Sequence, residues 1–146
     1  MEIKKVCFIF ALSIKQTMAK VYRIEHTEMK SPYNDMVGHG CYVNSPIDAE
    51  WYEEMRDLHS NIDTHPNIHV DELTDFTRLD YVCCFATLLD LENWFEGYID
   101  LLAEEGYVIH EYEIEGEPIH GLSMKQAMFD PDKIISRKKF EKSLVD

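Results

Sequence analysis

The sequence predicts an α+β fold in a single compact domain, with a mixed or antiparallel sheet and two main helices. Its 146 residues correspond to one domain, since a domain usually holds about 100–200 residues. Hydrophobic residues make up 45% and aromatic residues 12% of the chain, which excludes an intrinsically disordered protein. Alternating and helical hydrophobic patterns follow one another in the order β, α, loop, β, α, β, β, which is typical of this class.

Residues 1–17 are predicted to form an N-terminal extension, and residues 18–146 to form the domain. The apolar run at positions 6–14 is too short to span a bilayer. It imitates a short secretory signal, but Lys15 and Gln16 interrupt it before a cleavage site, which makes secretion the weaker interpretation. We therefore expect a cytoplasmic protein that does not associate with membranes.

The first half of the domain is predicted to contain a strand, a glycine loop and a helix. Residues 20–26 alternate apolar and polar side chains, which predicts a strand with Arg23 and Glu25 on one face. The glycines at 38 and 40 predict a turn or a place where a ligand approaches the backbone. A Ser-Pro pair at 45–46 predicts the start of a helix that ends near His59. The expected buried stripe of this helix is Ile47, Trp51, Met55 and Leu58.

In the second half, a long loop over residues 60–77 is predicted to lead into a strand at 79–85. Thr87 is the expected N-cap of a helix over 88–105, with Asp90 at its third position and Gly106 as the residue that ends it. The elements expected after this helix are a strand at 107–114, a hairpin partner at 122–129 and a short basic tail at 133–142.

The cysteines and histidines form no clear metal site. Cys83 and Cys84 are interpreted as small apolar strand residues in a reducing compartment. A group of potential ligands does occur in the long loop, namely His59, Asp63, His65, His69 and Asp71. Pro66 disfavours a helix that would place two of these rings on one face, so we predict a solvated turn and no metal. The chain also has no nucleophile elbow, P-loop or dinucleotide fingerprint.

The charge is strongly negative and unevenly distributed. The chain has 28 acidic and 14 basic side chains and a net charge of −14, which argues against direct binding of nucleic acid. Residues 48–117 carry 20 of the acidic and only two of the basic side chains. One interpretation is a pair of solvated helix faces that keep the protein soluble. The other is a surface that docks on a basic partner protein.

The first strand and the loop after it are predicted to build a pocket from Arg23, His26, Tyr33, His39 and Tyr42. The strand at 21–23, the glycine and tyrosine loop, the capped helix and the late segment at 126–131 resemble the layout of ADP-ribosyltransferase-like domains. This resemblance implies NAD as the cofactor, bound by the five pocket residues, with Arg23 on the phosphates or ribose. It implies a catalytic role for Arg23 and Gln126, although the family's catalytic glutamate is absent from the late segment.

A second resemblance concerns the segments at 85–95, 106–108 and 126–129, which are similar to small proteins of tailed phages and prophages. It covers about residues 20–135 and implies a protein that acts in the cytoplasm of a host cell. Three functions stay open. The first is an acidic accessory protein that binds and blocks a basic host factor, with an anti-CRISPR-like antagonist of a defence complex as one form. The others are an NAD-consuming ADP-ribosyltransferase-like enzyme and a non-catalytic housekeeping or virion-assembly module.

Overall fold

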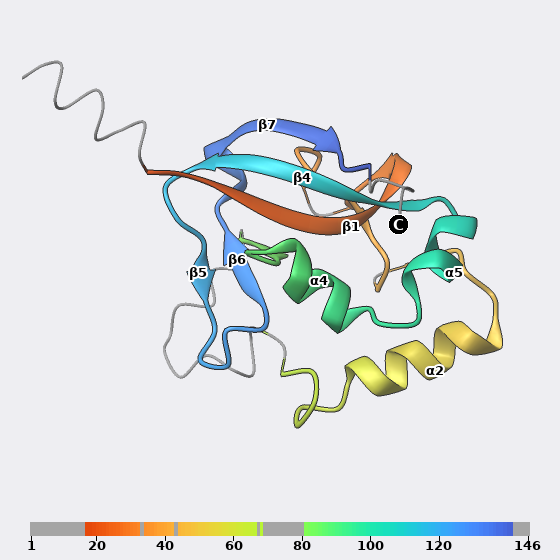
Figure 1. Cartoon of the computed structure of the whole chain (residues 1–146). Coiled ribbons are helices and arrows are strands. Elements are labelled where there is room, and N and C mark those ends of the chain that lie inside the picture. The colour runs from red at the N-terminus through yellow and green to blue at the C-terminus, as the bar shows by residue number, and fades with distance from the viewer. Residues whose placement is uncertain (1–16, 33, 43, 67, 69–80, 142–146) are drawn as a thin grey trace, which may run out of the picture.

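A computed structural model describes residues 17–32, 34–42, 44–66, 68 and 81–141 (Figure 1). The predicted extension at 1–17 therefore lies outside the described residues except for Thr17, as does much of the predicted loop at 60–77. Within the described part, helices and antiparallel sheets combine in an α+β fold, as the sequence predicted. No helix among these residues is long and apolar enough to cross a membrane.

Two antiparallel sheets and three helices make up the described fold. The four-stranded sheet has the order β2-β1-β4-β7, and the three-stranded sheet has the order β3-β6-β5. The first sheet contains β1 (Met18–Lys30), β2 (Gly38–Gly40), β4 (Tyr107–Glu115) and β7 (Ile134–Lys139). The second contains β3 (Val82–Cys84), β5 (Ile119–His120) and β6 (Ala127–Phe129). The helices are α2 (Glu50–His59), α4 (Leu88–Trp94) and α5 (Ile99–Glu104).

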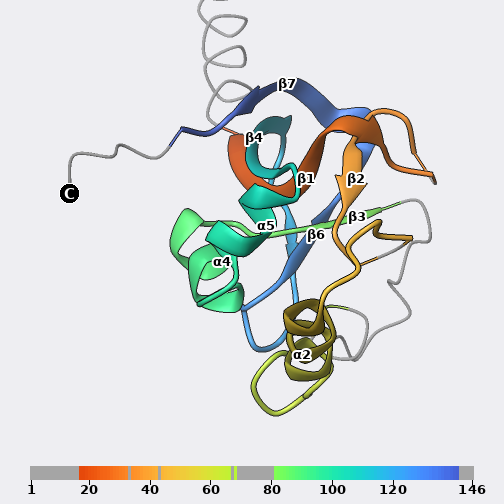
Figure 2. The same ribbon diagram turned by 90° about the vertical axis from the view of Figure 1, so that its right-hand side faces the viewer.

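Strand β1 connects most of these elements. One of its edges pairs with β4 from Met18 to His26, and the other pairs with β2 near its C-terminal end. A bridge between Tyr22 and Phe85 also joins β1 to the chain just after β3, with backbone N···O distances of 2.8 and 2.9 Å. In Figures 1 and 2, β7 lies at the top of the four-stranded sheet, and α2, α4 and α5 lie below β1.

The buried residues form two groups. The larger group packs the helices against β1 and β4, and it includes Met55, Leu91, Phe95, Leu102 and Tyr107. The smaller group lies between the two sheets, and it includes Val21, Cys84, Tyr112, Ile114 and Phe129. Cys84 is buried in β3 as the sequence predicted, and Cys41 is a buried free thiol. Burial raises the pKa of Cys41 to about 12, so this thiol is not a reactive thiolate at neutral pH.

The helix predicted from Ser45 begins instead at Glu50. Residue 49 is still extended, with φ −151° and ψ 148°, and the Ser45 hydroxyl lies 3.3 Å from the hydroxyl of Tyr107. Ser45 thus anchors an extended segment to β4 and does not cap the helix. Consequently the buried face of α2 is formed by Tyr52, Met55 and His59, whereas the predicted core residue Leu58 is 40% exposed.

The predicted helix over 88–105 is two helices. Its N-cap is correct, because the Thr87 side chain accepts a hydrogen bond from the Asp90 backbone N–H at 3.1 Å. Gly97 has φ +87° and interrupts the helix between α4 and α5. Gly106, with φ +90°, ends the second helix as predicted.

Three predictions for segments that lie in the sheets were wrong, one in the pairing of a strand and two in the type of element. Strand β6 lies between β3 and β5, so it is not a hairpin partner of β4. The predicted basic tail contains β7, which pairs with β4. The glycine loop at 38–40 is the short strand β2, paired with the end of β1. These pairings join segments far apart in sequence, and periodicity carries no information about such partners.

Candidate functional site

A pocket of about 620 Å³ opens between β1, β2, the chain around β3, the end of α2 and α4. This volume is within the range of small-molecule sites. Its apolar wall consists of Ile24, Val37, Cys41, Val82, Phe85, Trp94 and Phe95. Its polar lining includes Arg23, Ser31, Asn34, His39, Tyr42, Arg56, His59, Ser60, Tyr81 and Gln126.

The pocket brings together four of the residues predicted to form a site. Arg23, His39, Tyr42 and Gln126 all line it. His26 is not among the lining residues. Its Nδ1 atom accepts backbone hydrogen bonds from Glu28 and Met29, each at 3.1 Å. Tyr33 lies outside the described residues.

The Arg23 guanidinium is held by the protein itself. Its Nε atom donates to Glu25 Oε2 at 2.6 Å, and its two terminal nitrogens donate to the carbonyl oxygens of Cys83 and Gly38. An arginine binds a phosphate through the same planar set of N–H groups. Arg23 thus ties β1 to β2 and β3, and these contacts would have to break before it could bind a pyrophosphate.

Glu25 is the centre of this network and is fully buried. Besides Arg23, it accepts hydrogen bonds from His110 Nδ1 at 2.7 Å, the Tyr112 hydroxyl at 2.8 Å and the backbone N–H of Gly38 at 3.0 Å. Burial opposes the ionised carboxylate, but the hydrogen bond from His110 and the charge of Arg23 outweigh it and lower the pKa of Glu25 to about 2. Glu25 is therefore a carboxylate at neutral pH, with four different groups donating to it.

The Gln126 side chain also has a structural partner. Its Oε1 atom accepts a hydrogen bond from the backbone N–H of Ile68 at 2.8 Å, and Ile68 is fully buried. A neutral amide in this position cannot supply the negative charge that a catalytic glutamate provides. The structure thus gives Gln126 a role in fixing the chain at Ile68.

Tyr42 links two other aromatic side chains in the pocket wall. Its hydroxyl accepts from Trp94 Nε1 at 2.9 Å and lies 2.6 Å from His59 Nδ1. An indole N–H only donates, so the single hydroxyl proton of Tyr42 is available for His59 Nδ1. In the neutral imidazole, the remaining proton of His59 is then on Nε2.

His59 and His65 meet as part of the same aromatic cluster. Their rings stack with centroids 4.6 Å apart, and Trp94, Phe95 and Tyr98 surround His59. Burial, together with the neighbouring His65, lowers the pKa of His59 to about 4, so the ring is neutral at pH 7. Among the residues that the structure describes, no three histidine, cysteine or acidic side chains form a metal site. The predicted neighbours His69 and Asp71 lie outside them.

Two buried histidine atoms in the pocket wall have no hydrogen-bond partner among the described residues. They are Nε2 of His39 and Nε2 of His59, and both side chains line the pocket. His39 is 3% and His59 is 7% exposed. Buried polar atoms are normally hydrogen-bonded, and a third such atom, Nδ1 of His120, lies outside the pocket lining.

Sequence reasoning did not anticipate the central position of Glu25 or the contact between His59 and His65. An arginine and a glutamate two residues apart on a strand predict a shared face, and that much was correct. No signal in the pattern indicated that this face is buried under β2 and β3. The histidine spacing did place His59 and His65 in one segment, but it could not show that their rings stack.

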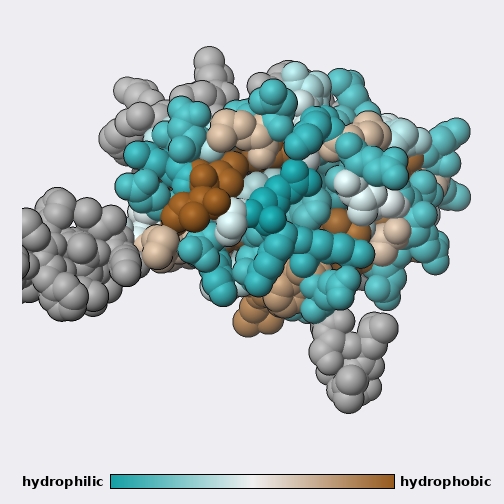
Figure 3. All heavy atoms as spheres, turned by 90° about the horizontal axis from the view of Figure 1, so that it is seen from above, coloured by the Kyte–Doolittle hydropathy of each residue, from teal (hydrophilic) through white to brown (hydrophobic). Residues whose placement is uncertain are grey.

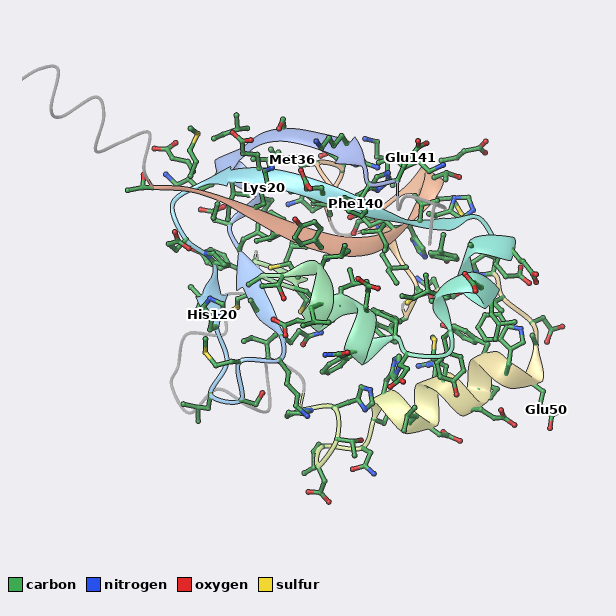
Figure 4. The ribbon with its side chains drawn as sticks, viewed as in Figure 1. Lys20, Met36, Glu50, His120, Phe140 and Glu141 are labelled. Atoms are coloured by element: carbon green, nitrogen blue, oxygen red, sulfur yellow. The ribbon has the colours of Figure 1, made fainter. Side chains whose placement is uncertain are left out.

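The surface charge is segregated between the helices and strand β7. The segments 50–59 and 88–105 contain ten acidic side chains and a single basic one, Arg56. Strand β7 contains three basic side chains and no acidic one. The face above β7 and β4 is mainly hydrophilic with smaller apolar patches (Figure 3), and Glu50 projects away from α2 on the other side (Figure 4). The helices are thus mainly acidic and β7 is basic, although Glu111 of the neighbouring strand β4 pairs with Lys138 at 3.4 Å.

Comparison with known proteins identifies a phage family. The model of the family described as "Bacteriophage T4 Y00F protein" matches residues 18–143, a segment that includes all the described strands and helices. No curated protein and no solved structure matches the chain. The resemblance to phage proteins is thus confirmed, and the chain belongs to the Bacteriophage T4 Y00F protein family.

Proposed function

We propose that this phage protein binds and blocks a basic protein in the host cytoplasm, such as a component of a defence complex. The contact surface is the acidic face formed by α2 and residues 96–105. The observation that carries the proposal is the segregation of charge between this face and β7. A surface rich in one sign of charge attracts a partner of the opposite sign and orients it during the encounter.

The acidic side chains on this face are free to meet a partner. Those of α2 are Glu50, Glu53, Glu54 and Asp57, and all four are exposed. Glu96, Asp100, Glu104 and Glu105 are exposed as well. None of the eight forms an ion pair within the described residues, so their charge is not neutralised inside the protein.

A matched pair of variants tests this proposal. The first neutralises α2 with Glu50→Gln, Glu53→Gln, Glu54→Gln and Asp57→Asn. The second makes the same change in net charge at exposed acids elsewhere, with Glu28→Gln, Asp35→Asn, Glu115→Gln and Glu117→Gln. Host proteins captured by each chain are identified by mass spectrometry at about 50 mM and 300 mM salt, concentrations between which screening increases strongly.

The expected result is one basic host protein that binds the parent chain and the second variant but not the first. Its binding weakens at the higher salt concentration, and its activity in a purified assay falls when the parent chain is added. Equal binding by both variants would contradict the proposal. A virion-assembly role would instead place the chain in purified phage particles.

The NAD-dependent transferase is the less favoured candidate. Four of its predicted residues line the pocket, but Arg23 and Gln126 are both held by contacts within the protein. Incubation of the parent chain with labelled NAD and host lysate is therefore expected to transfer no label. Transfer of label by the parent chain would support the enzyme and contradict this preference.

A further inference from the structure

The pocket lining contains several side chains that can donate a hydrogen bond to a ligand. The side-chain oxygen of Gln126 is taken by the N–H of Ile68, and that of Asn34 is taken by the N–H of Met36. Each of these amides still has its NH₂ group as a donor for a ligand. His59 offers its Nε2–H, since its Nδ1 atom faces the hydroxyl of Tyr42. Asn34, His59 and Gln126 thus each bring an N–H donor to the pocket lining.

The charge of the pocket lining has the opposite sign to that of the whole protein. The lining includes Arg23 and Arg56 but no aspartate or glutamate among the described residues, although the chain has 28 acidic side chains. The charge of Arg23 is neutralised by Glu25 at 2.6 Å. Arg56 is exposed, lines the pocket and forms no ion pair within the described residues.

Part of the pocket wall is aromatic. Phe85, Trp94 and Phe95 form a cluster there. The ring centroid of Phe85 lies 5.6 Å from that of Trp94 and 6.1 Å from that of Phe95. Tyr42 stacks on Phe95 at 6.0 Å and an angle of 18°. Aromatic walls favour planar apolar groups, and a small number of polar groups in such a pocket then fixes their orientation.

We propose that this pocket binds a small organic anion with a planar aromatic body. The anionic group lies toward Arg56 and the N–H donors, and the ring lies against Phe85 and Phe95. The proposed ligand contacts Arg56 and not the acidic side chains of the face proposed above, although Arg56 belongs to the same helix, α2. The two unpartnered histidine nitrogens in the wall support a polar ligand over an apolar one.

Two fluorescent probes of nearly the same shape test the proposal. They are 8-anilinonaphthalene-1-sulfonate, a planar aromatic anion, and N-phenyl-1-naphthylamine, which lacks the sulfonate. Each is titrated into the full chain, and the stoichiometry is measured by calorimetry. The anion is expected to bind with one molecule per chain and at least ten times more tightly than its uncharged counterpart.

The variant Arg56→Gln identifies the site, and Lys139→Gln on β7 is its matched control. Both side chains are exposed and both changes remove one positive charge, so neither is expected to unfold the protein. Arg56→Gln should weaken binding of the anion about tenfold and leave the uncharged probe unchanged, whereas Lys139→Gln should affect neither. Equal affinity for the two probes, several bound molecules per chain, or an unchanged affinity in Arg56→Gln would overturn the proposal.

Discussion

Arg23 and Glu25 lie on the same face of β1 and form an ion pair of 2.6 Å that holds three strands together. The arginine also donates to backbone oxygens of β2 and β3, and the glutamate accepts from the backbone of β2. A buried ion pair is stable only when further hydrogen bonds satisfy both partners, and this pair fulfils that condition. The predicted phosphate-binding arginine is therefore part of the structural framework.

Removing the charge of Glu25 should strongly destabilise the protein. Glu25→Gln leaves the buried Arg23 without its counter-ion, and breaking one side of such a pair typically costs about 3–5 kcal/mol. Urea unfolding followed by circular dichroism measures this loss. The control Glu113→Gln, on β4 and only partly buried, is expected to change the free energy of unfolding by less than about 1 kcal/mol. A similar effect of both changes would contradict the central role of Glu25.

The close contact between β2 and Glu25 predicts different effects at two glycines. A Cβ atom added at Gly38 would lie 2.8 Å from Glu25 Cβ, whereas one added at Gly40 would meet only Arg23 Nη2 at 3.6 Å. Gly38→Ala is therefore expected to lower the free energy of unfolding by about 1–3 kcal/mol. Gly40→Ala should be nearly neutral, and a thermal melt of both variants compares them directly. Equal melting temperatures would show that β2 shifts without cost.

The Tyr42 hydroxyl should contribute to stability through Trp94. In Tyr42→Phe the indole N–H of Trp94 loses its acceptor, and an unsatisfied buried donor costs about 1–3 kcal/mol. Urea denaturation monitored by tryptophan fluorescence is the measurement. Tyr98→Phe is the control, since no hydrogen bond to its hydroxyl occurs among the described contacts and the side chain is partly exposed. A larger loss in the control would exclude the proposed hydrogen bond.

Stability should fall as the pH is lowered from about 6.5 to about 4, because of His59. The folded state holds the pKa of this ring at about 4, against 6.5 for an ordinary histidine. Between these values the unfolded chain binds the extra proton and the folded chain does not, so acid favours unfolding. The loss is about 3 kcal/mol once the pH is below 4.

The variant His59→Gln should flatten this part of the stability profile, measured by urea unfolding at a series of pH values. His26→Gln should leave it in place. The contribution of Glu25 falls in a separate window, since its lowered pKa of about 2 means that its stabilisation is present above pH 4.5 and is lost as the pH falls through 2. An unchanged slope between pH 6.5 and 4 in His59→Gln would show that another group titrates there.

Local signals in the sequence predicted several elements correctly. The Thr87 cap, the glycine at position 106 and the alternation of residues 20–26 and 107–114 all correspond to observed features. Each depends on neighbours within a few residues. Gly97 shows the limit of this approach, because the helical pattern of apolar residues continues through it while its positive φ divides the helix.

Long-range contacts account for what the sequence did not predict. Ser45 is a suitable helix cap by composition, but its contact with Tyr107 holds it in an extended segment. The burial of Glu25 depends on Gly38 of β2 and on His110 and Tyr112 of β4, two strands that lie far from it in the sequence. Four residues of the pocket lining were predicted from the sequence. Its aromatic wall was not, because that wall forms only when α4, β1 and the residues after β3 come together.

The position of β7 at the outside of the four-stranded sheet has a consequence for solubility. An outer strand exposes unpaired backbone groups that can recruit a strand from another molecule and start aggregation. Here the sequence of that strand is rich in cations, with Lys138 and Lys139 both exposed. Two copies approaching edge to edge would bring these like charges together. The basic strand thus protects the sheet against self-association at high expression levels.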